Sequence, residues 1–117
     1  MPVERVEIDD KLLRRVLPYH VKDDGSVSSA AFMTRSRKPD SACSVFLERM
    51  PSAYDDAGKN RLPNQQLARF AATVAMDMGM TVTHVPTVDL LSHCEINIKT
   101  KQQCREFATN SELVPFA

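Results

Sequence analysis

The stretch "LSHCEINIK", residues 91–99, decides the fold class, because its apolar and polar residues alternate as they do in a half-buried β-strand. We therefore predict a strand here, with a thiol and two isoleucines turned toward a core and with polar groups turned away from it. The inward set is Cys94, Ile96 and Ile98, and the outward set is His93, Glu95, Asn97 and Lys99.

The residues that follow, "TKQQCREFATN" at 100–110, predict a helix that begins with a capping box. The hydroxyl of Thr100 can accept from the backbone N–H of Gln103, and the Gln103 side chain can reach back. The expected inner face of this helix carries Cys104, Phe107 and Ala108.

Two further helices are predicted upstream. In "PNQQLARFAATVAMDMGM", residues 63–80, apolar side chains recur at helical spacing from Leu67 to Met78. Pro63 suits the first turn of this helix, and Gly79 suits its end. A short N-terminal helix is predicted in "DDKLLRRVLP", residues 9–18, since its leucines and valine also fit a helical spacing.

The remaining segments predict short strands and loops. In the strand expected within residues 41–50, Val45 and Leu47 share one face and Phe46 lies on the other. We expect it to form a hairpin with the strand before it. Residues 51–62 combine proline, glycine and aspartates and are predicted to be an exposed connection. The other predicted strands cover residues 3–8, 26–33 and 81–85.

These elements predict an α+β fold in one domain spanning residues 1–117. The expected architecture is a small, mostly antiparallel sheet with two main helices packed on one face, plus the short N-terminal helix. The other face of the sheet would then meet solvent or a partner.

Composition and the N-terminal sequence argue against several classes of protein, although they leave a local basic patch open. Lysine plus arginine and aspartate plus glutamate both number 15, so no strong general attraction to nucleic acid is expected. No run approaches the roughly 20 apolar residues of a membrane helix, and the N-terminus lacks the apolar core of a secretory signal. Three cysteines without CxxC spacing predict reduced thiols, and we expect a cytoplasmic location.

A histidine-based site is the strongest candidate for chemistry. Histidine is the usual acid or base near neutral pH, and Glu95, two residues along the same strand face, could orient His93. Together with His20 and the hydroxyls of Ser28 and Ser29, these two residues could form a small acid–base site. Its substrate would be a phosphodiester, a nucleotide or an ester. The alternative is that His93 and Glu95 are only a solvated pair.

Other site types are less favoured. A metal ion is not expected, because His93 and Cys94 are adjacent in a strand and face opposite ways. With three glycines and no glycine-rich phosphate motif, no nucleotide cofactor is expected. Arg35, Arg37 and Lys38 form a basic loop that could bind a phosphate or an acidic partner, but no aromatic residue accompanies them.

The segments "HVKDDGSVSSAAFMTR", "CSVFLERM" and "SHCEINI" carry a pattern of the form H, G-x-h-S-S-x-A-F, S-V and H-x-x-I. In this pattern the chain resembles a group of small bacterial proteins of unassigned activity. The resemblance implies a bacterial or phage setting and carries over no catalytic residue. The matching positions are His20, Gly25, Ser28, Ser29, Ala31, Phe32, Ser44, Val45, His93 and Ile96.

Two functions follow as the main hypotheses, and nucleic-acid binding through Arg35 and Arg37 is a third that is possible but not favoured. The first, which we favour, is a non-enzymatic accessory or regulatory subunit that binds a larger protein, as in toxin–antitoxin or phage-defence systems. Association of the chain with a second copy of itself is the other form of this hypothesis. Its predicted contact residues are Arg35, Arg37, Lys38, Asn97 and Lys99. The alternative is a small His-dependent enzyme that uses His93, Glu95 and His20.

Overall fold

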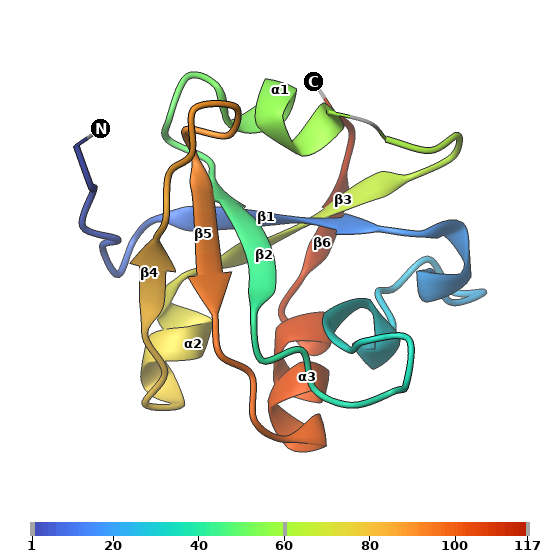
Figure 1. Cartoon of the computed structure of the whole chain (residues 1–117). Coiled ribbons are helices and arrows are strands. Elements are labelled where there is room, and N and C mark those ends of the chain that lie inside the picture. The colour runs from blue at the N-terminus through green and yellow to red at the C-terminus, as the bar shows by residue number, and fades with distance from the viewer. Residues whose placement is uncertain (1, 60, 117) are drawn as a thin grey trace.

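The computed structural model describes residues 2–59 and 61–116, and its core is one six-stranded antiparallel sheet (Figure 1). The strand order across the sheet is β4-β5-β2-β1-β3-β6. This arrangement confirms the α+β class and the antiparallel sheet. The strands are β1 (Lys11–Val16), β2 (Cys43–Leu47), β3 (Gln66–Ala71), β4 (Val82–His84), β5 (His93–Ile96) and β6 (Glu112–Val114). The α-helices are α1 (Ala53–Gly58), α2 (Thr73–Asp77) and α3 (Lys101–Thr109), and the 3-10 helices are η1 (Pro18–His20) and η2 (Ser29–Phe32).

The predicted N-terminal helix is wrong, because residues 11–16 form β1, between β2 and β3 in the sheet. Leu12 and Val16 pack on one face of the sheet and Leu13 on the other, and all three side chains are fully buried. A strand covered on both sides can carry apolar residues at every position. The spacing of the apolar residues in β1 then resembles that of an amphipathic helix.

The same cause explains the error in residues 63–80. The chain there forms β3 and then the short helix α2, not one long helix. Leu67 and Phe70 lie on opposite faces of β3, and each packs in a different apolar cluster. Gly79 does follow the helix with a left-handed φ of 75°, as predicted.

The segment before β2 also differs from prediction. Residues 26–33 contain η2, whose first turn is capped by the Ser28 hydroxyl accepting from the backbone of Ala30. No hairpin therefore joins this segment to β2, which pairs instead with β1 and β5. Residues 3–8, predicted as an edge strand, form an extended arm outside the sheet.

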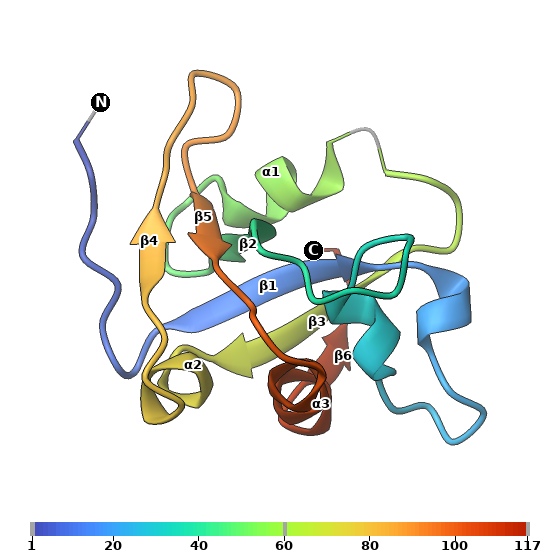
Figure 2. The ribbon, with the colours of Figure 1, turned by 60° about the horizontal axis from the view of Figure 1, so that its bottom comes forward.

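The helices cover both faces of the sheet, whereas two helices on one face were predicted. The first face packs against α2, α3 and η2, which lie on the same side of the sheet in Figure 2. The second face is defined here by Leu13, Phe46 and Leu67, and it packs against α1 through Ala53 and Ala57. Residues 51–62 are thus not merely an exposed connection, because α1 lies within them.

The C-terminal third follows the sequence closely. β4 and β5 form where strands were predicted, and α3 begins with the expected Thr100–Gln103 capping box. Cys104, Phe107 and Ala108 are the buried residues of α3. The strand β6 was not predicted. Within the described ranges, no helix is long and apolar enough to cross a bilayer.

Candidate functional site

Strand β5 presents its side chains as the alternation predicts. Cys94 and Ile96 are fully buried and Ile98 is 1% exposed, all on the first face. On the second face, His93 and Glu95 are half-buried. Asn97 and Lys99, just beyond the strand, are exposed. His93 and Glu95 therefore lie on the face opposite Cys94, whereas Asn97 and Lys99 lie next to the start of α3, where the backbone N–H of Lys99 donates to the Gln103 side chain.

His93 is held by a hydrogen bond at each ring nitrogen. Its Nδ1 lies 3.0 Å from the carbonyl oxygen of Val85, and its Nε2 lies 3.0 Å from the hydroxyl oxygen of Ser44. A carbonyl oxygen only accepts, so Nδ1 carries the proton and donates it. Nε2 is then the acceptor, and the Ser44 hydroxyl donates to it. The ring also meets Phe46 edge-on, with centroids 6.2 Å apart.

Glu95 lies beside this pair and does not bond to it. It is the direct cross-strand partner of Ser44 in β2 and of Thr83 in β4. Among the described residues, no hydrogen bond or ion pair joins Glu95 to His93. The group that orients the imidazole is the Val85 carbonyl, in the place where the sequence predicted a carboxylate.

The other predicted catalytic residues form a second group around η1 and η2. The carbonyl of His20 accepts from the backbone N–H of Ser28 at 2.7 Å, and Ser29 begins η2. In Figure 1, η1 lies beyond the right-hand end of β1, whereas β5 is toward the left. No hydrogen bond or ring contact within the described part of the chain connects this group to His93.

Local contacts account for the state of His20. Its Nδ1 accepts from the backbone N–H of Leu17 at 3.1 Å. Burial, with a smaller contribution from the Arg14 guanidinium, lowers the pKa of His20 below its usual value. Its neutral form is therefore favoured, and its hydrogen bonds hold the chain in a turn. The predicted five-residue catalytic set thus occupies two places in the fold, and its role stays a prediction.

The predicted contact residues are also in two places. Arg35, Arg37 and Lys38 are exposed in the loop between η2 and β2, and Arg37 has a left-handed φ of 60°. Asn97 and Lys99 line a cavity of about 600 Å³ beside β4 and β5, together with Glu95. Their role in binding stays a prediction.

The third histidine, His84, is a structural residue. It is 4% exposed, and its Nδ1 accepts from the backbone N–H of Glu4 at 2.7 Å. Its Nε2 lies 2.7 Å from the Leu91 carbonyl, to which it donates. Both nitrogens are thus engaged. Among residues 2–59 and 61–116, no three histidine, cysteine, aspartate or glutamate side chains converge to hold a metal ion.

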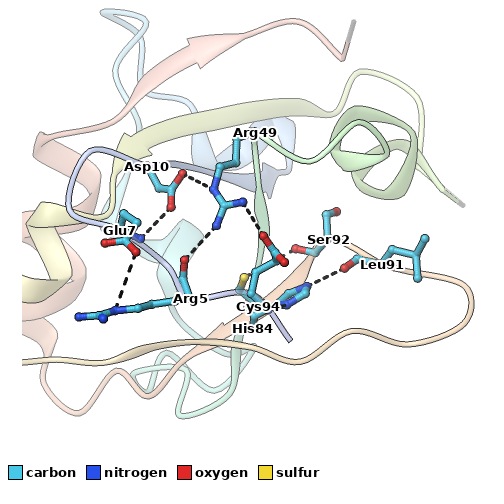
Figure 3. A network of polar contacts seen from close by, with 9 residues as sticks. Arg5, Glu7, Asp10, Arg49, His84, Leu91, Ser92 and Cys94 are labelled. Carbon is cyan, nitrogen blue, oxygen red and sulfur yellow. Dashed lines mark hydrogen bonds and ion pairs between the residues drawn. The ribbon is translucent and has the colours of Figure 1, made fainter. Parts of the chain in front are cut away.

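An arginine next to β2 fixes the N-terminal arm, residues 2–8, as Figure 3 shows. Arg49 donates to the carboxylate of Asp10 at 2.9 Å, to the carboxylate of Glu4 at 2.7 Å and to the carbonyl of Arg5 at 2.9 Å. The other Asp10 oxygen accepts from the backbone N–H of Glu7 at 2.7 Å. The sequence gives no local signal for this network, because Arg49 lies more than 40 residues from the arm.

The three cysteines lack nucleophilic character. All are buried and free. Burial raises the pKa of the Cys94 thiol to about 12 and that of Cys43 to about 11, and it also raises the pKa of Cys104. A thiol with so high a pKa stays neutral at physiological pH, and the neutral form is not the reactive one.

Ser44 is the functional candidate that the sequence reasoning missed. Its separation of 49 residues from His93 leaves no local motif. The available signal was its position in a predicted strand, on the face opposite Val45. Comparison of the chain with protein-family models, with curated protein sequences and with solved structures gave no match.

Proposed function

We propose that this protein is a small interaction module, an accessory or regulatory subunit that binds a larger protein partner through the loop between β4 and β5 and the neighbouring second face. The observation that carries the proposal is a group of apolar side chains exposed on this one loop. Val85 is 36% exposed, Leu91 43% and Val88 83%. Burying such side chains against an apolar pocket would contribute about 25 cal/mol per Å².

The loop is held in shape by its own hydrogen bonds. Thr87 and Leu90 exchange backbone bonds of 3.1 and 3.2 Å, and the Thr87 hydroxyl accepts a further bond of 3.0 Å from Leu90. His84 holds the Leu91 carbonyl, and the Lys59 ammonium donates to the Asp89 carbonyl. A loop ordered before binding loses little conformational entropy on binding.

The surroundings of the loop suit a protein partner. α1 packs over β1 and β2, so β4 and β5 lie at the side of the second face that carries no helix (Figure 1). His93, Glu95 and Thr83 provide a polar border next to the apolar loop. An apolar centre with a polar border is typical of protein interfaces. The zero net charge of the chain leaves little repulsion to oppose association.

The partner we propose is a folded protein with an apolar pocket for Val88 and Leu91, in a bacterial cell. Toxin–antitoxin and phage-defence systems are the settings in which we would look first. This setting depends on the sequence resemblance alone.

The test is affinity capture from the native cell, followed by mass measurement of the intact complex. Val88→Asp and Leu91→Asp should each lose a stoichiometric partner, because a carboxylate in an apolar pocket is costly. Leu62→Asp is the matched control, since Leu62 is 59% exposed on a different loop. Equal capture by all three variants would contradict the proposal.

A further inference from the structure

The strands β2 and β5 bring one hydroxyl and one imidazole into a reactive arrangement. Ser44 and His93 are hydrogen-bonded at 3.0 Å, with the imidazole in the tautomer whose Nε2 has a free lone pair for the hydroxyl proton. A third group, the Val85 carbonyl, fixes that tautomer through Nδ1. Nucleophile, base and orienting group are the three parts that activated serines require.

Two strands of the sheet position Ser44 and His93. Ser44 and His93 lie on adjacent, directly paired strands, β2 and β5. The backbone carbonyl of Ser44 also accepts from the Arg14 guanidinium at 3.0 Å. Phe46 supports the imidazole ring from the same strand as Ser44. Groups held on strands keep their geometry better than groups on loops.

A cavity adjoins the pair through Val85, whose carbonyl bonds to His93, and through Glu95; neither Ser44 nor His93 is among its described lining residues. Both side chains are half-buried on the second face, and α1 packs over β1 and β2. Glu95, directly opposite Ser44, lines the cavity of about 600 Å³. Met78, Met80 and Val85 give this cavity an apolar part that suits a short acyl chain. Glu95 and Lys99 place one charge of each sign in this cavity, so a charged substrate is not specially favoured.

We propose that Ser44 is a nucleophile and His93 its general base, and that together they cleave esters of short-chain carboxylic acids. The Ser44 oxygen forms a bond to the acyl carbon while its proton passes to His93 Nε2. The bond from the acyl carbon to the leaving oxygen then breaks, and His93 returns the proton to that oxygen. Water, activated by the same imidazole, releases the acid and restores the serine. This reaction goes beyond the proposed binding function and does not depend on it.

The experiment uses the purified chain alone, with a fluorophosphonate probe for serine and p-nitrophenyl butyrate as the ester. Wild-type protein should acquire one probe, which fragmentation of the labelled peptide places on Ser44. Ser44→Ala should abolish that label and the ester hydrolysis. His93→Gln should slow both by 100-fold or more, the usual contribution of a general base. Ser36→Ala, a change at an exposed loop serine, is the matched control and should label as wild type does.

Absence of label at Ser44 in the wild-type protein would overturn the proposal, whatever the variants do. Equal labelling of wild type and His93→Gln would also overturn it, because the imidazole would then have no part in the reaction. Circular dichroism and thermal melting of each variant distinguish the loss of the general base from unfolding of the protein. Since no partner is present, none of these outcomes bears on the proposed interaction.

Discussion

The carboxylate of Asp56 accepts two hydrogen bonds from Ser92, one from its backbone N–H at 3.0 Å and one from its hydroxyl at 2.5 Å. Asp56 is in α1 and is 3% exposed, and Ser92 is fully buried immediately before β5. A third bond reaches the same oxygen from the Ser52 hydroxyl at 2.9 Å. This contact links α1 to the strand that carries His93. It therefore stabilises both the part of the second face that α1 covers and the part at β4 and β5 that carries no helix.

Asp56→Ala should therefore destabilise the protein by about 2 kcal/mol, because it leaves the buried Ser92 donors without an acceptor. Asp56→Asn keeps one acceptor oxygen and should cost less. Urea unfolding monitored by circular dichroism measures both. Asp55→Ala, at the exposed neighbouring position, is the control. A loss for Asp56→Ala no larger than that for Asp55→Ala would contradict the role of this contact.

A second prediction concerns the charged cluster on the second face. Arg69 donates to both carboxylate oxygens of Glu48, at 2.7 and 2.9 Å, and Tyr54 donates to the same carboxylate at 2.7 Å. The Arg69 hydrogen bonds, followed by that from Tyr54, hold the pKa of Glu48 below its usual value, against the opposing effect of burial. Because the folded pKa is lowered, this stabilisation is present above about pH 4.5 and is lost as the pH falls through the folded pKa.

Glu48→Gln should accordingly cost about 1 kcal/mol at pH 7. The difference from wild type should shrink as the pH falls toward 3, since the wild-type carboxylate then becomes protonated too. Melting temperatures recorded from pH 7 to pH 3 give the comparison. Asp23→Asn removes an equal charge from an exposed loop and serves as the control. A constant difference across this range would show that the ion pair is not the cause.

Some of these relationships could be predicted from the sequence and others could not. The strand β5 was predicted because one of its faces is polar and only half-buried, so that Cys94 and Ile96 alternate with His93 and Glu95. The strands β1 and β3 were not predicted, because both of their faces are buried. Apolar residues then occupy odd and even positions alike, and the alternation of a half-buried strand is lost. Only tertiary packing distinguishes such strands from helices.

The residues of the candidate site could likewise be predicted only in part. The outward direction of His93 follows from local alternation. Its partner Ser44 does not, because strand order and register must be known before two residues 49 apart can be paired. The buried His84 and the Arg49 network were missed for the same reason, since both reach the N-terminal arm from distant parts of the chain. β6 has only three residues and leaves too short a pattern to recognise.

The buried thiols give a third prediction. In the folded protein, Cys43, Cys94 and Cys104 should react with a disulfide reagent only as fast as the chain unfolds, because they are buried and neutral. The Cys94 pKa of about 12 lies above the ordinary value of 9.0, so unfolded chains lose this proton first. Stability should therefore fall as the pH rises above about 9. Rapid reaction of any of the three thiols in native buffer at pH 8 would contradict this account.

A fourth prediction concerns the N-terminal arm. Arg49→Ala removes bonds to Glu4, Asp10 and the Arg5 carbonyl, so the arm should open more often. Trypsin cleavage after Arg5, whose side chain is 89% exposed, should then be about tenfold faster. The mass of the truncated chain, followed over time, measures this rate. Arg35→Ala, in an exposed loop, should leave the rate unchanged; an unchanged rate in Arg49→Ala would mean that the arm is held by other contacts.

The most direct test of the proposed binding function is hydrogen exchange of the chain alone and in its captured complex. We predict that protection on binding will be confined to the loop 85–92 and the flanking residues of β4 and β5. Val88→Asp should abolish this protection together with the complex, whereas Leu62→Asp should keep both. Protection at the opposite edge of the sheet, around residues 61–66 and 113–116, with the loop unchanged, would contradict the account.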